Sequence, residues 1–150
     1  MAMTVRDAIQ IRVGTLADGE AVARLLVTMG YPVELKSAEE RMRELVAQSD
    51  DNLVLVATVG IVVAGVVAGH LIPMLQQEQP LGRITALAVD EDQRGLGVGK
   101  RLLAAAERWF ADRGASRIEV TSAEHREQAH EFFRKAGFRE QRLRLIKNRH

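Results

Sequence analysis

Residues 89–101 read VDEDQRGLGVGKR, and this stretch decides the fold because it joins a predicted buried strand to a predicted helix. Glycine at positions 95, 97 and 99 lets backbone N–H groups point the same way and approach a ligand closely. The helix dipole adds roughly half a positive charge at that end, and the two residues after the last glycine are basic. The stretch therefore predicts a cradle for a pyrophosphate group.

Two common phosphate-binding motifs do not fit this glycine turn (residues 94–99). A nucleotide P-loop needs Gly, four residues and then Gly-Lys-Ser/Thr, but Arg94 stands where the first glycine belongs and Arg101 replaces the hydroxyl. A dinucleotide fingerprint needs Gly-x-Gly-x-x-Gly in a βαβ unit, whereas these glycines are one residue too close and no parallel βαβ repeat is expected. What remains is Arg/Gln-x-x-Gly-x-Gly/Ala, with Arg94, Gly97 and Gly99 as its defining residues.

The segment before the turn begins with a predicted strand over residues 9–13 and two helices. Asp18 is the expected cap of the first helix, whose apolar positions follow the helical spacing i, i+3, i+4, i+7 and which ends at residues 30–32, Gly-Tyr-Pro. Ser37 and Glu40 form the pattern of a capping box, which predicts the start of the second helix.

Residues 53–75 carry no formal charge, and Gly65 and Gly69 have the spacing of a membrane-helix dimer motif. Valine is frequent there, however, and glycine, histidine and proline interrupt the run, which favours strands over a long helix. We expect a β-hairpin of residues 53–59 and 61–72. Because both strands are almost continuously apolar, helices must cover both faces of the sheet.

The segment after the turn predicts a helix over 99–113, a strand over 117–121, a helix over 124–136 and one or two final strands within 138–147. A strand over 83–89 precedes the turn. The whole chain, residues 1–150, is therefore expected to form one domain of the α/β (α+β) class. We predict a three-layer sandwich, with helices on both faces of a mixed, mostly antiparallel sheet of six or seven strands.

Composition limits the function. Hydrophobic residues make up 47% and charged residues 27% of the chain, as in a globular protein, and the lack of cysteine excludes disulfides and thiolate sites. No apolar block of a signal peptide begins the chain, so a cytoplasmic location and no membrane association are expected. A formal net charge of +1 argues against nucleic-acid binding. The basic segment 134–150 fits an exposed strand and also fits a surface that attracts a phosphorylated ligand.

The glycine turn resembles the acetyl-coenzyme A signature of the GNAT superfamily of N-acetyltransferases. Residues 84–90 look like the fourth strand of that family, and residues 129–138 look like its second motif. The resemblance implies that acetyl-CoA is the cosubstrate and that Leu87 and Val89 pair with its pantetheine arm through their backbones. The residues that it implies for acetyl-CoA binding are Leu87, Ala88, Val89, Arg94, Gly95, Leu96, Gly97, Val98, Gly99 and Lys100. No metal is implied.

The family's reaction is direct attack of an amine on the thioester in a ternary complex, with backbone N–H groups stabilising the oxyanion. The resemblance implies a primary amine as acceptor, and a small molecule fits better than a protein. The family's usual acid, a tyrosine, is replaced by Phe133, and no carboxylate lies between Glu78 and Asp90. The catalytic groups are therefore unassigned, with Glu78 and His125 as weak candidates.

Several interpretations stay open at this stage. His70, at the end of a buried strand, is interpreted as structural, as is Phe133 on an apolar helical stripe. The missing tyrosine leaves a non-catalytic acyl-CoA-binding regulatory module as the alternative to an enzyme. Acidic residues in 34–51 fit a polyamine or aminoglycoside acceptor, but an exposed helix explains them equally well. A homodimer is compatible with the resemblance, because family members often pair.

Overall fold

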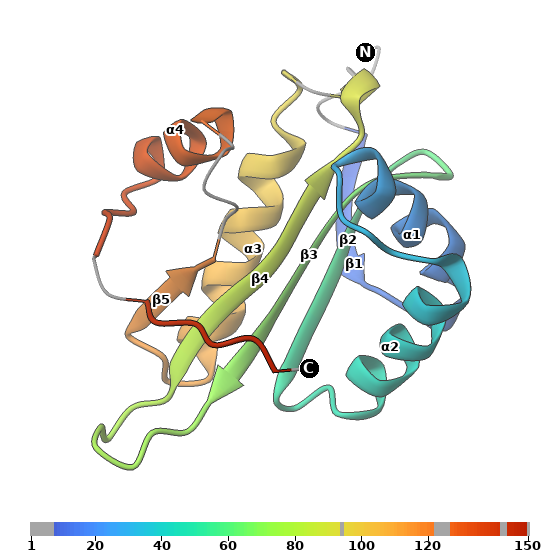
Figure 1. Ribbon diagram of the computed structural model, residues 1–150. Coiled ribbons are helices and arrows are strands. Elements are labelled where there is room, and N and C mark those ends of the chain that lie inside the picture. Colours follow the sequence, from blue (N-terminus) through green and yellow to red (C-terminus); the bar gives the residue numbers. More distant parts are fainter. Residues whose placement is uncertain (1–7, 94, 122–126, 142–143, 150) are drawn as a thin grey trace.

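Figure 1 shows the fold in a computed structural model, which describes residues 8–93, 95–121, 127–141 and 144–149. The strands are β1 (Ile9–Val13), β2 (Asn52–Val59), β3 (Val62–Ile72), β4 (Leu81–Val89) and β5 (Arg117–Val120). The helices are α1 (Gly19–Thr28), α2 (Leu35–Ala47), α3 (Val98–Asp112) and α4 (Glu127–Lys135). Single 3-10 turns precede α1 at Leu16–Asp18 and follow β4 at Glu91–Gln93.

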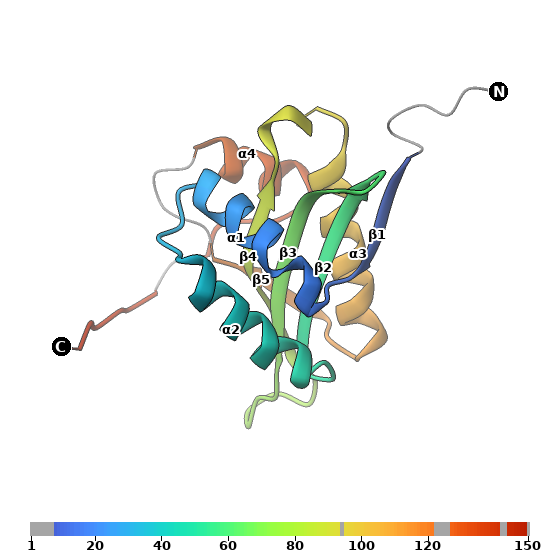
Figure 2. The same ribbon diagram turned by 90° about the vertical axis from the view of Figure 1, so that its right-hand side faces the viewer.

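The strands form one sheet in the order β1-β2-β3-β4-β5. The first four are antiparallel neighbours, and β5 runs parallel to β4. Figure 2 looks onto the sheet, with α1 and α2 in front of it and α3 behind it, so helices cover both faces. We call these the α1–α2 face and the α3 face. The predicted α/β sandwich with a mixed, mostly antiparallel sheet is confirmed.

The predicted number of strands is not confirmed: the described residues form five strands, not six or seven. Residues 138–141 and 144–149 lie outside regular secondary structure, and 142–143 fall outside the described residues. Leu145 and Ile146 are 92% and 67% exposed, and Figure 2 shows this end of the chain extending away from the body. Charged residues outnumber apolar ones in the segment, so an added strand would bury little apolar surface.

Element boundaries differ from the predictions by a few residues. The second helix begins at Leu35, because Ala38 N–H already donates to Glu34 O at 2.9 Å, so Ser37 lies inside the helix and not at its cap. Strand β4 begins at Leu81 and helix α3 at Val98, each earlier than predicted. Residues 124–126 of the last predicted helix fall outside the described residues, and the described part begins at Glu127.

Close packing of α3 on the sheet explains the glycines in β3 and β4. A Cβ atom at Gly65 would lie 2.8 Å from Leu102 Cδ1, and one at Gly69 would lie 2.7 Å from Arg83 O. A Cβ at Gly82 would lie 2.7 Å from the ring of Phe110. The spacing of Gly65 and Gly69 thus reflects a strand under a helix, and the predicted hairpin is confirmed. Within the described ranges, no helix has the length and apolar character to cross a membrane.

The sheet separates two apolar cores. The core on the α3 face includes Phe110, Leu102 and Ile84, all almost completely buried. The core on the α1–α2 face is smaller, and it joins Val22 and Leu25 of α1 to valines of β2 and β3. Ala88 is the buried β4 residue of this second core. Farther toward the start of β4, the polar side chains of Arg83 and Thr85 lie on the α1–α2 face.

A partly buried ion pair lies at the start of α1, with the Arg12 side chain 45% exposed. The carboxylate of Asp18 is 5% exposed and accepts hydrogen bonds from both terminal nitrogens of Arg12 at 2.8 Å. It also accepts one from Thr15 N–H at 2.8 Å. The hydrogen bonds from Arg12, with smaller help from Thr15, hold the pKa of Asp18 below its ordinary value of 3.8 despite the opposing effect of burial.

Replacing Asp18 with asparagine is expected to lower the free energy of unfolding at pH 7 by about 1–2 kcal/mol, since a buried carboxylate loses its charge-assisted hydrogen bonds to the half-exposed Arg12. A depressed carboxyl pKa stabilises the fold above pH 3.8, and that stability is lost as the pH falls through the lower, folded pKa. The difference in the free energy of unfolding between wild type and variant, measured by urea denaturation, should therefore shrink below pH 3.8.

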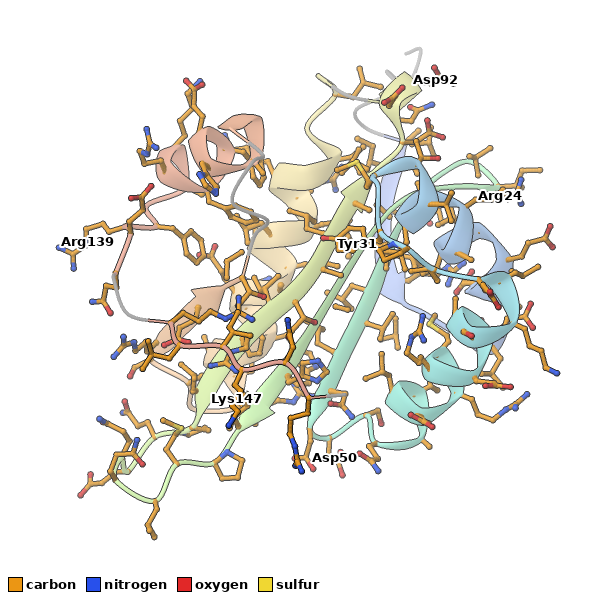
Figure 3. The ribbon with its side chains drawn as sticks, viewed as in Figure 1. Arg24, Tyr31, Asp50, Asp92, Arg139 and Lys147 are labelled. Atoms are coloured by element: carbon orange, nitrogen blue, oxygen red, sulfur yellow. The ribbon has the colours of Figure 1, made fainter. Side chains whose placement is uncertain are left out.

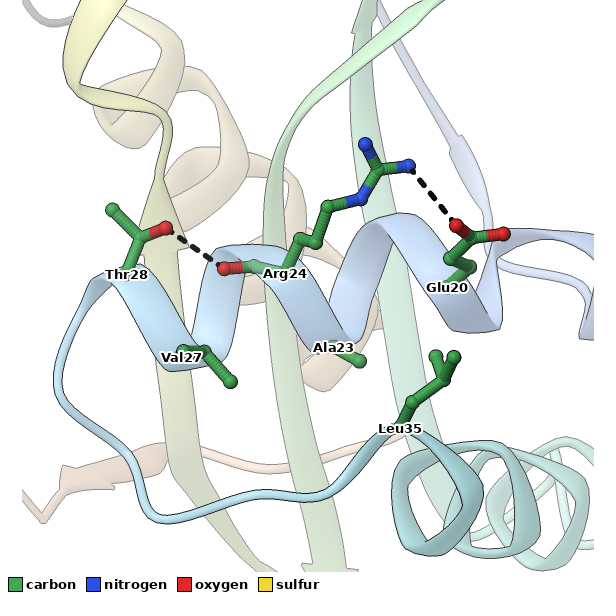
Figure 4. Close-up of a pocket in the computed structure, with 6 residues that line it drawn as sticks. All are labelled: Glu20, Ala23, Arg24, Val27, Thr28 and Leu35. Atoms are coloured by element: carbon green, nitrogen blue, oxygen red, sulfur yellow. Dashed lines mark hydrogen bonds and ion pairs between the residues drawn. The ribbon is translucent and has the colours of Figure 1, made fainter.

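The control is Glu20→Gln, which removes the exposed pair of Glu20 and Arg24 at 3.8 Å (Figure 4). Its expected effect is below about 0.5 kcal/mol. Equal losses for the two variants would contradict the importance of the partly buried pair.

Candidate active site

The glycine turn leads into α3 with backbone groups free of side chains. Gly97 is the N-cap of α3 with φ 84°, and Gly95 also has φ 84°. A Cβ atom added to either residue would meet nothing within 4 Å, so both border open space. The first hydrogen bond of the helix runs from Arg101 N–H to Gly97 O at 3.0 Å. The N–H groups of residues 98–100 precede it and therefore have no acceptor within the helix.

Gly99 has a different role from the other two glycines. It lies in the first turn of α3, where an added Cβ would be 3.5 Å from both Phe132 Cζ and Val89 Cγ2. This is an ordinary van der Waals distance, so alanine also fits at position 99. The contact shows that the start of α3, the end of β4 and α4 meet at one place.

Strand β4 has an open edge beside β5. The two strands pair from Leu81 to Ile84, and the last link is Thr121 N–H to Ile84 O at 3.2 Å. From there to Val89, β4 stays paired with β3 but has no strand partner on its other side among the described residues. Asp90 N–H donates to Ala64 O on the β3 side. Because the polar groups of successive residues alternate along a strand, those of Leu87 and Val89 point to the open side.

The open edge and the turn are consecutive in the chain. An extended ligand that paired with the edge would have one end at the positive terminus of α3, where an anion is favoured. Of the residues predicted to bind the cofactor, 87–89 form the end of β4 and 95–100 form the turn and the start of α3. Arg94 falls outside the described residues.

Polar side chains form a row across four strands on the α1–α2 face. We call it the polar row; it consists of Asn52, His70, Arg83, Thr85 and Glu119. His70 Nδ1 lies 2.8 Å from Asn52 Oδ1, and His70 Nε2 lies 3.3 Å from Thr85 Oγ1. Arg83 pairs with Glu119 at 3.2 Å. Burial, and then the charge of Arg83, hold the pKa of His70 below its ordinary value of 6.5.

The model of the acetyltransferase (GNAT) family matches residues 19–138 of the chain. The chain belongs to this family. The match covers the glycine turn, β4, β5, α3 and α4, which together form the open edge and the cradle. Membership in GNAT assigns the general activity of acyl transfer.

Solved structures share the fold over almost the whole chain. An aminoglycoside acetyltransferase, meta-AAC0020, from an uncultured soil metagenomic sample, in complex with sisomicin, has a TM-score of 0.83 and 21% identity. The alignment covers 98% of this chain and 100% of that one. The aminoglycoside N-acetyltransferase AAC(6')-Iy in complex with CoA has a TM-score of 0.82 and 19% identity, with coverage of 94% and 95%.

A transcriptional regulator from Bacillus halodurans C-125 is equally similar, with a TM-score of 0.83, 22% identity and coverage of 93% and 99%. At these identities the likeness shows the GNAT fold and not the substrate. A comparison with curated proteins finds no match.

The described residues do not bring Glu78 or Phe133 together with other groups that could act as acid or base. Phe133 packs edge-on against Phe132 and Phe138, with ring centroids 5.2 and 5.6 Å apart, as expected for a packing residue. Glu78 is exposed in the loop before β4, whereas the GNAT glycine turn follows the other end of that strand. His125 falls outside the described residues. Over the described ranges, no three His, Asp or Glu side chains are grouped so as to hold a metal ion.

Sequence reasoning missed the polar row. Its members are far apart in the chain, and they meet because the registers pair Asn52 with His70, His70 with Arg83, and Arg83 with Glu119. A register shift between Ala68 and Gly69 then leaves Thr85 as an extra residue in β4. These alignments depend on strand pairing, which the local pattern of this GNAT sequence does not specify.

A second concave surface lies away from these groups. It is a shallow depression between α1 and Leu35 at the start of α2, lined by Ala23, Val27 and Thr28 as well as the exposed pair of Glu20 and Arg24 (Figure 4). Half of the six lining side chains are alkyl groups, and the two charged ones form an ion pair with each other. The depression therefore offers no group for acyl transfer.

Proposed function

We propose that the protein transfers an acetyl group from acetyl-CoA to a primary amine by direct attack in a ternary complex. The observation that carries the proposal is the open edge of β4 that leads directly into the N–H groups at the start of α3, which have no acceptor within the helix. This arrangement suits a ligand with an extended amide-bearing arm and a diphosphate, which is the chemistry of coenzyme A.

The proposed roles follow from the position of each group. The polar backbone groups of Leu87 and Val89 pair with the pantetheine arm, and the N–H groups of residues 98–100 hold the pyrophosphate. Arg94 and Lys100 supply positive charge beside it. Backbone N–H groups at the β4 bulge stabilise the oxyanion that forms when the amine attacks the thioester.

The acceptor is proposed to be a small amine that approaches from the α1–α2 face. Two similar folds belong to aminoglycoside acetyltransferases, one of them in complex with sisomicin, which supports a small-molecule acceptor over a protein. The segment from Glu34, just before α2, to Asp51, in the loop after it, holds six acidic and three basic residues (Figure 3 labels Asp50). This excess of negative charge favours a cationic acceptor by long-range attraction. We further propose that the protein is cytoplasmic, and the proposed function is compatible with a homodimer.

The test is incubation of the wild-type protein with radiolabelled acetyl-CoA and a panel of small amines, aminoglycosides and peptides. Transfer of label to at least one amine, together with binding of acetyl-CoA in calorimetry, is the expected result. Binding of acetyl-CoA without transfer to any member of the panel would contradict the enzymatic proposal. A lack of binding would contradict the cofactor assignment as well.

The alternative is a non-catalytic acyl-CoA-binding regulatory module. Two observations favour it: Phe133 offers no proton, and a transcriptional regulator shares the fold. Replacing Phe133 with tyrosine distinguishes the two functions. If the wild type is an enzyme that uses other groups, kcat should stay within the same order of magnitude, because the ring remains in its aromatic cluster.

For a module that lacks only the acid, Phe133→Tyr should create activity, because a positioned acid contributes about a hundredfold or more. Phe138→Tyr is the matched control, since this ring belongs to the same cluster. New activity in Phe133→Tyr alone would establish the regulatory alternative.

A further inference from the structure

Thr85 stands where the open edge of β4 begins. Ile84 O accepts the last hydrogen bond from the β5 side, and Thr85 is the next residue. If the phosphates of the proposed cosubstrate lie at the start of α3 and its arm follows residues 89–87, the far end of the arm lies beside Thr85. That end carries the thioester. The hydroxyl of Thr85 lies on the α1–α2 face, from which the acceptor is proposed to approach.

The neighbours of His70 fix the proton on one ring nitrogen. With Asn52 Oδ1 as an acceptor 2.8 Å away, the tautomer that satisfies this contact carries its hydrogen on His70 Nδ1. In the neutral ring the other nitrogen, Nε2, then has a lone pair and accepts the hydrogen bond from the Thr85 hydroxyl. The ring is thereby oriented with its basic nitrogen toward the open edge of β4.

The charges around His70 favour the neutral ring. Arg83 of β4 is the charged neighbour that lowers the pKa of His70, and Glu119 of β5 is paired with Arg83. Strand β2 contributes the uncharged Asn52, and the helices α1 and α2 present apolar residues such as Leu25 and Met42 to this face. Together with burial, these surroundings keep the pKa of the ring below 6.5, so the ring is ready to accept a proton at neutral pH.

We infer that His70 accepts, through the hydroxyl of Thr85, the proton that the acceptor amine loses during acetyl transfer; this rests on the proposed function. The nitrogen lone pair forms the C–N bond, and the electrons of the C–S bond leave on the sulfur as a thiolate. The nitrogen proton passes to Thr85 Oγ1 as the Thr85 proton passes to His70 Nε2. The proton on His70 then returns, directly or through water, to the thiolate, so that free thiol and acetamide are the products.

The first test compares His70→Gln with the wild type. The variant keeps a polar side chain but lacks the basic nitrogen, so we expect kcat to fall about a hundredfold. The Kd for acetyl-CoA and the melting temperature should stay close to wild type. In the wild type, kcat/KM should rise with pH through a limb below 6.5, and that limb should vanish in the variant. His130→Gln, on α4 and outside the polar row, is the matched control and should keep wild-type turnover.

Two further variants separate proton transfer from a structural role. Asn52→Asp places a carboxylate on the Nδ1 side, which favours the charged ring, so the acid limb should move to higher pH. Thr85→Ser keeps the hydroxyl and should keep most of the activity, whereas Thr85→Val keeps the shape and should lose it. A merely structural His70 would not move the pH profile in this pattern.

The outcomes of the two proposals are distinct. A wild type that acetylates no amine overturns the proposed function and this inference with it. An active wild type with an equally active His70→Gln, or with Thr85→Val as active as Thr85→Ser, overturns the inference alone. Nitrogen NMR gives a readout that needs no turnover: a hydrogen on Nε2 in place of Nδ1, or a ring that is charged at pH 7, also contradicts it.

Discussion

Gly97→Val is expected to weaken acetyl-CoA binding about a thousandfold, because the loss of about two charge-assisted hydrogen bonds of about 2 kcal/mol each corresponds to that factor. Gly97 has φ 84°, a conformation that a β-branched residue rarely adopts. A Cβ added there would meet nothing within 4 Å, and the residue directly precedes the N–H groups of α3. A valine would both turn the peptide groups away and fill the place of the phosphates.

Gly114→Val is the matched control for this prediction. Gly114 follows the other end of α3, has φ 87°, and an added Cβ there also meets nothing within 4 Å. Each variant should lose about 1–2 kcal/mol of stability through the same backbone strain. Calorimetric titration with acetyl-CoA should be run well below the melting temperatures of both variants. We expect Gly114→Val to bind acetyl-CoA with wild-type affinity and Gly97→Val to bind it much more weakly. Similar affinities for the two variants would contradict the phosphate cradle.

Phe110→Ala is expected to lower the free energy of unfolding by about 4 kcal/mol, a large share of the stability of a domain of this size. The ring is 0% exposed and lies between α3 and the glycines at 69 and 82. Because three backbone segments surround the site, little can collapse into the cavity. Urea denaturation followed by circular dichroism measures the loss.

Two comparisons make the Phe110 prediction specific. Trp109→Ala removes a larger, partly exposed ring from the same turn of α3 and should cost less than half as much. Gly82→Ala should destabilise the wild type, whose ring would be 2.7 Å from the new Cβ, but not the Phe110→Ala background. Additive losses in the double variant would contradict the close approach of α3 to the sheet.

Local patterns predicted most of the fold because their causes are local. The valine-rich run 53–72 excluded a long helix by itself, and the glycine turn followed from spacing between residues in one loop. For the last segment, the local pattern predicted a strand that the described residues do not form. Residues such as Arg144 and Leu145 alternate as in a strand, but alternation alone provides no neighbour to pair with, and the described part of this segment lies outside the sheet.

The groups proposed to bind acetyl-CoA could be predicted from the sequence because they are local in the chain. The polar row, proposed to act on the amine, could not be predicted because its members are far apart in the chain. The open edge and the turn occupy consecutive residues, so a family pattern records them together. The polar row joins Asn52, His70 and Thr85 from three strands. His70 alone in a sequence is an ordinary strand residue. Its chemistry depends on which side chains the registers and the β4 bulge place at its two nitrogens.

In strand β4, the backbone polar groups and the polar side chains point in different directions. The peptide groups of Leu87 and Val89 face sideways along the sheet, whereas Thr85 and Arg83 project from it toward α1 and α2. Pairing of acetyl-CoA with peptide groups, as proposed, would not depend on which side chains the strand carries. Recognition of the amine on the α1–α2 face would depend on them. If β4 binds the donor and the acceptor as proposed, substitutions on the α1–α2 face can change the amine that is accepted without altering the peptide groups that bind the thioester donor.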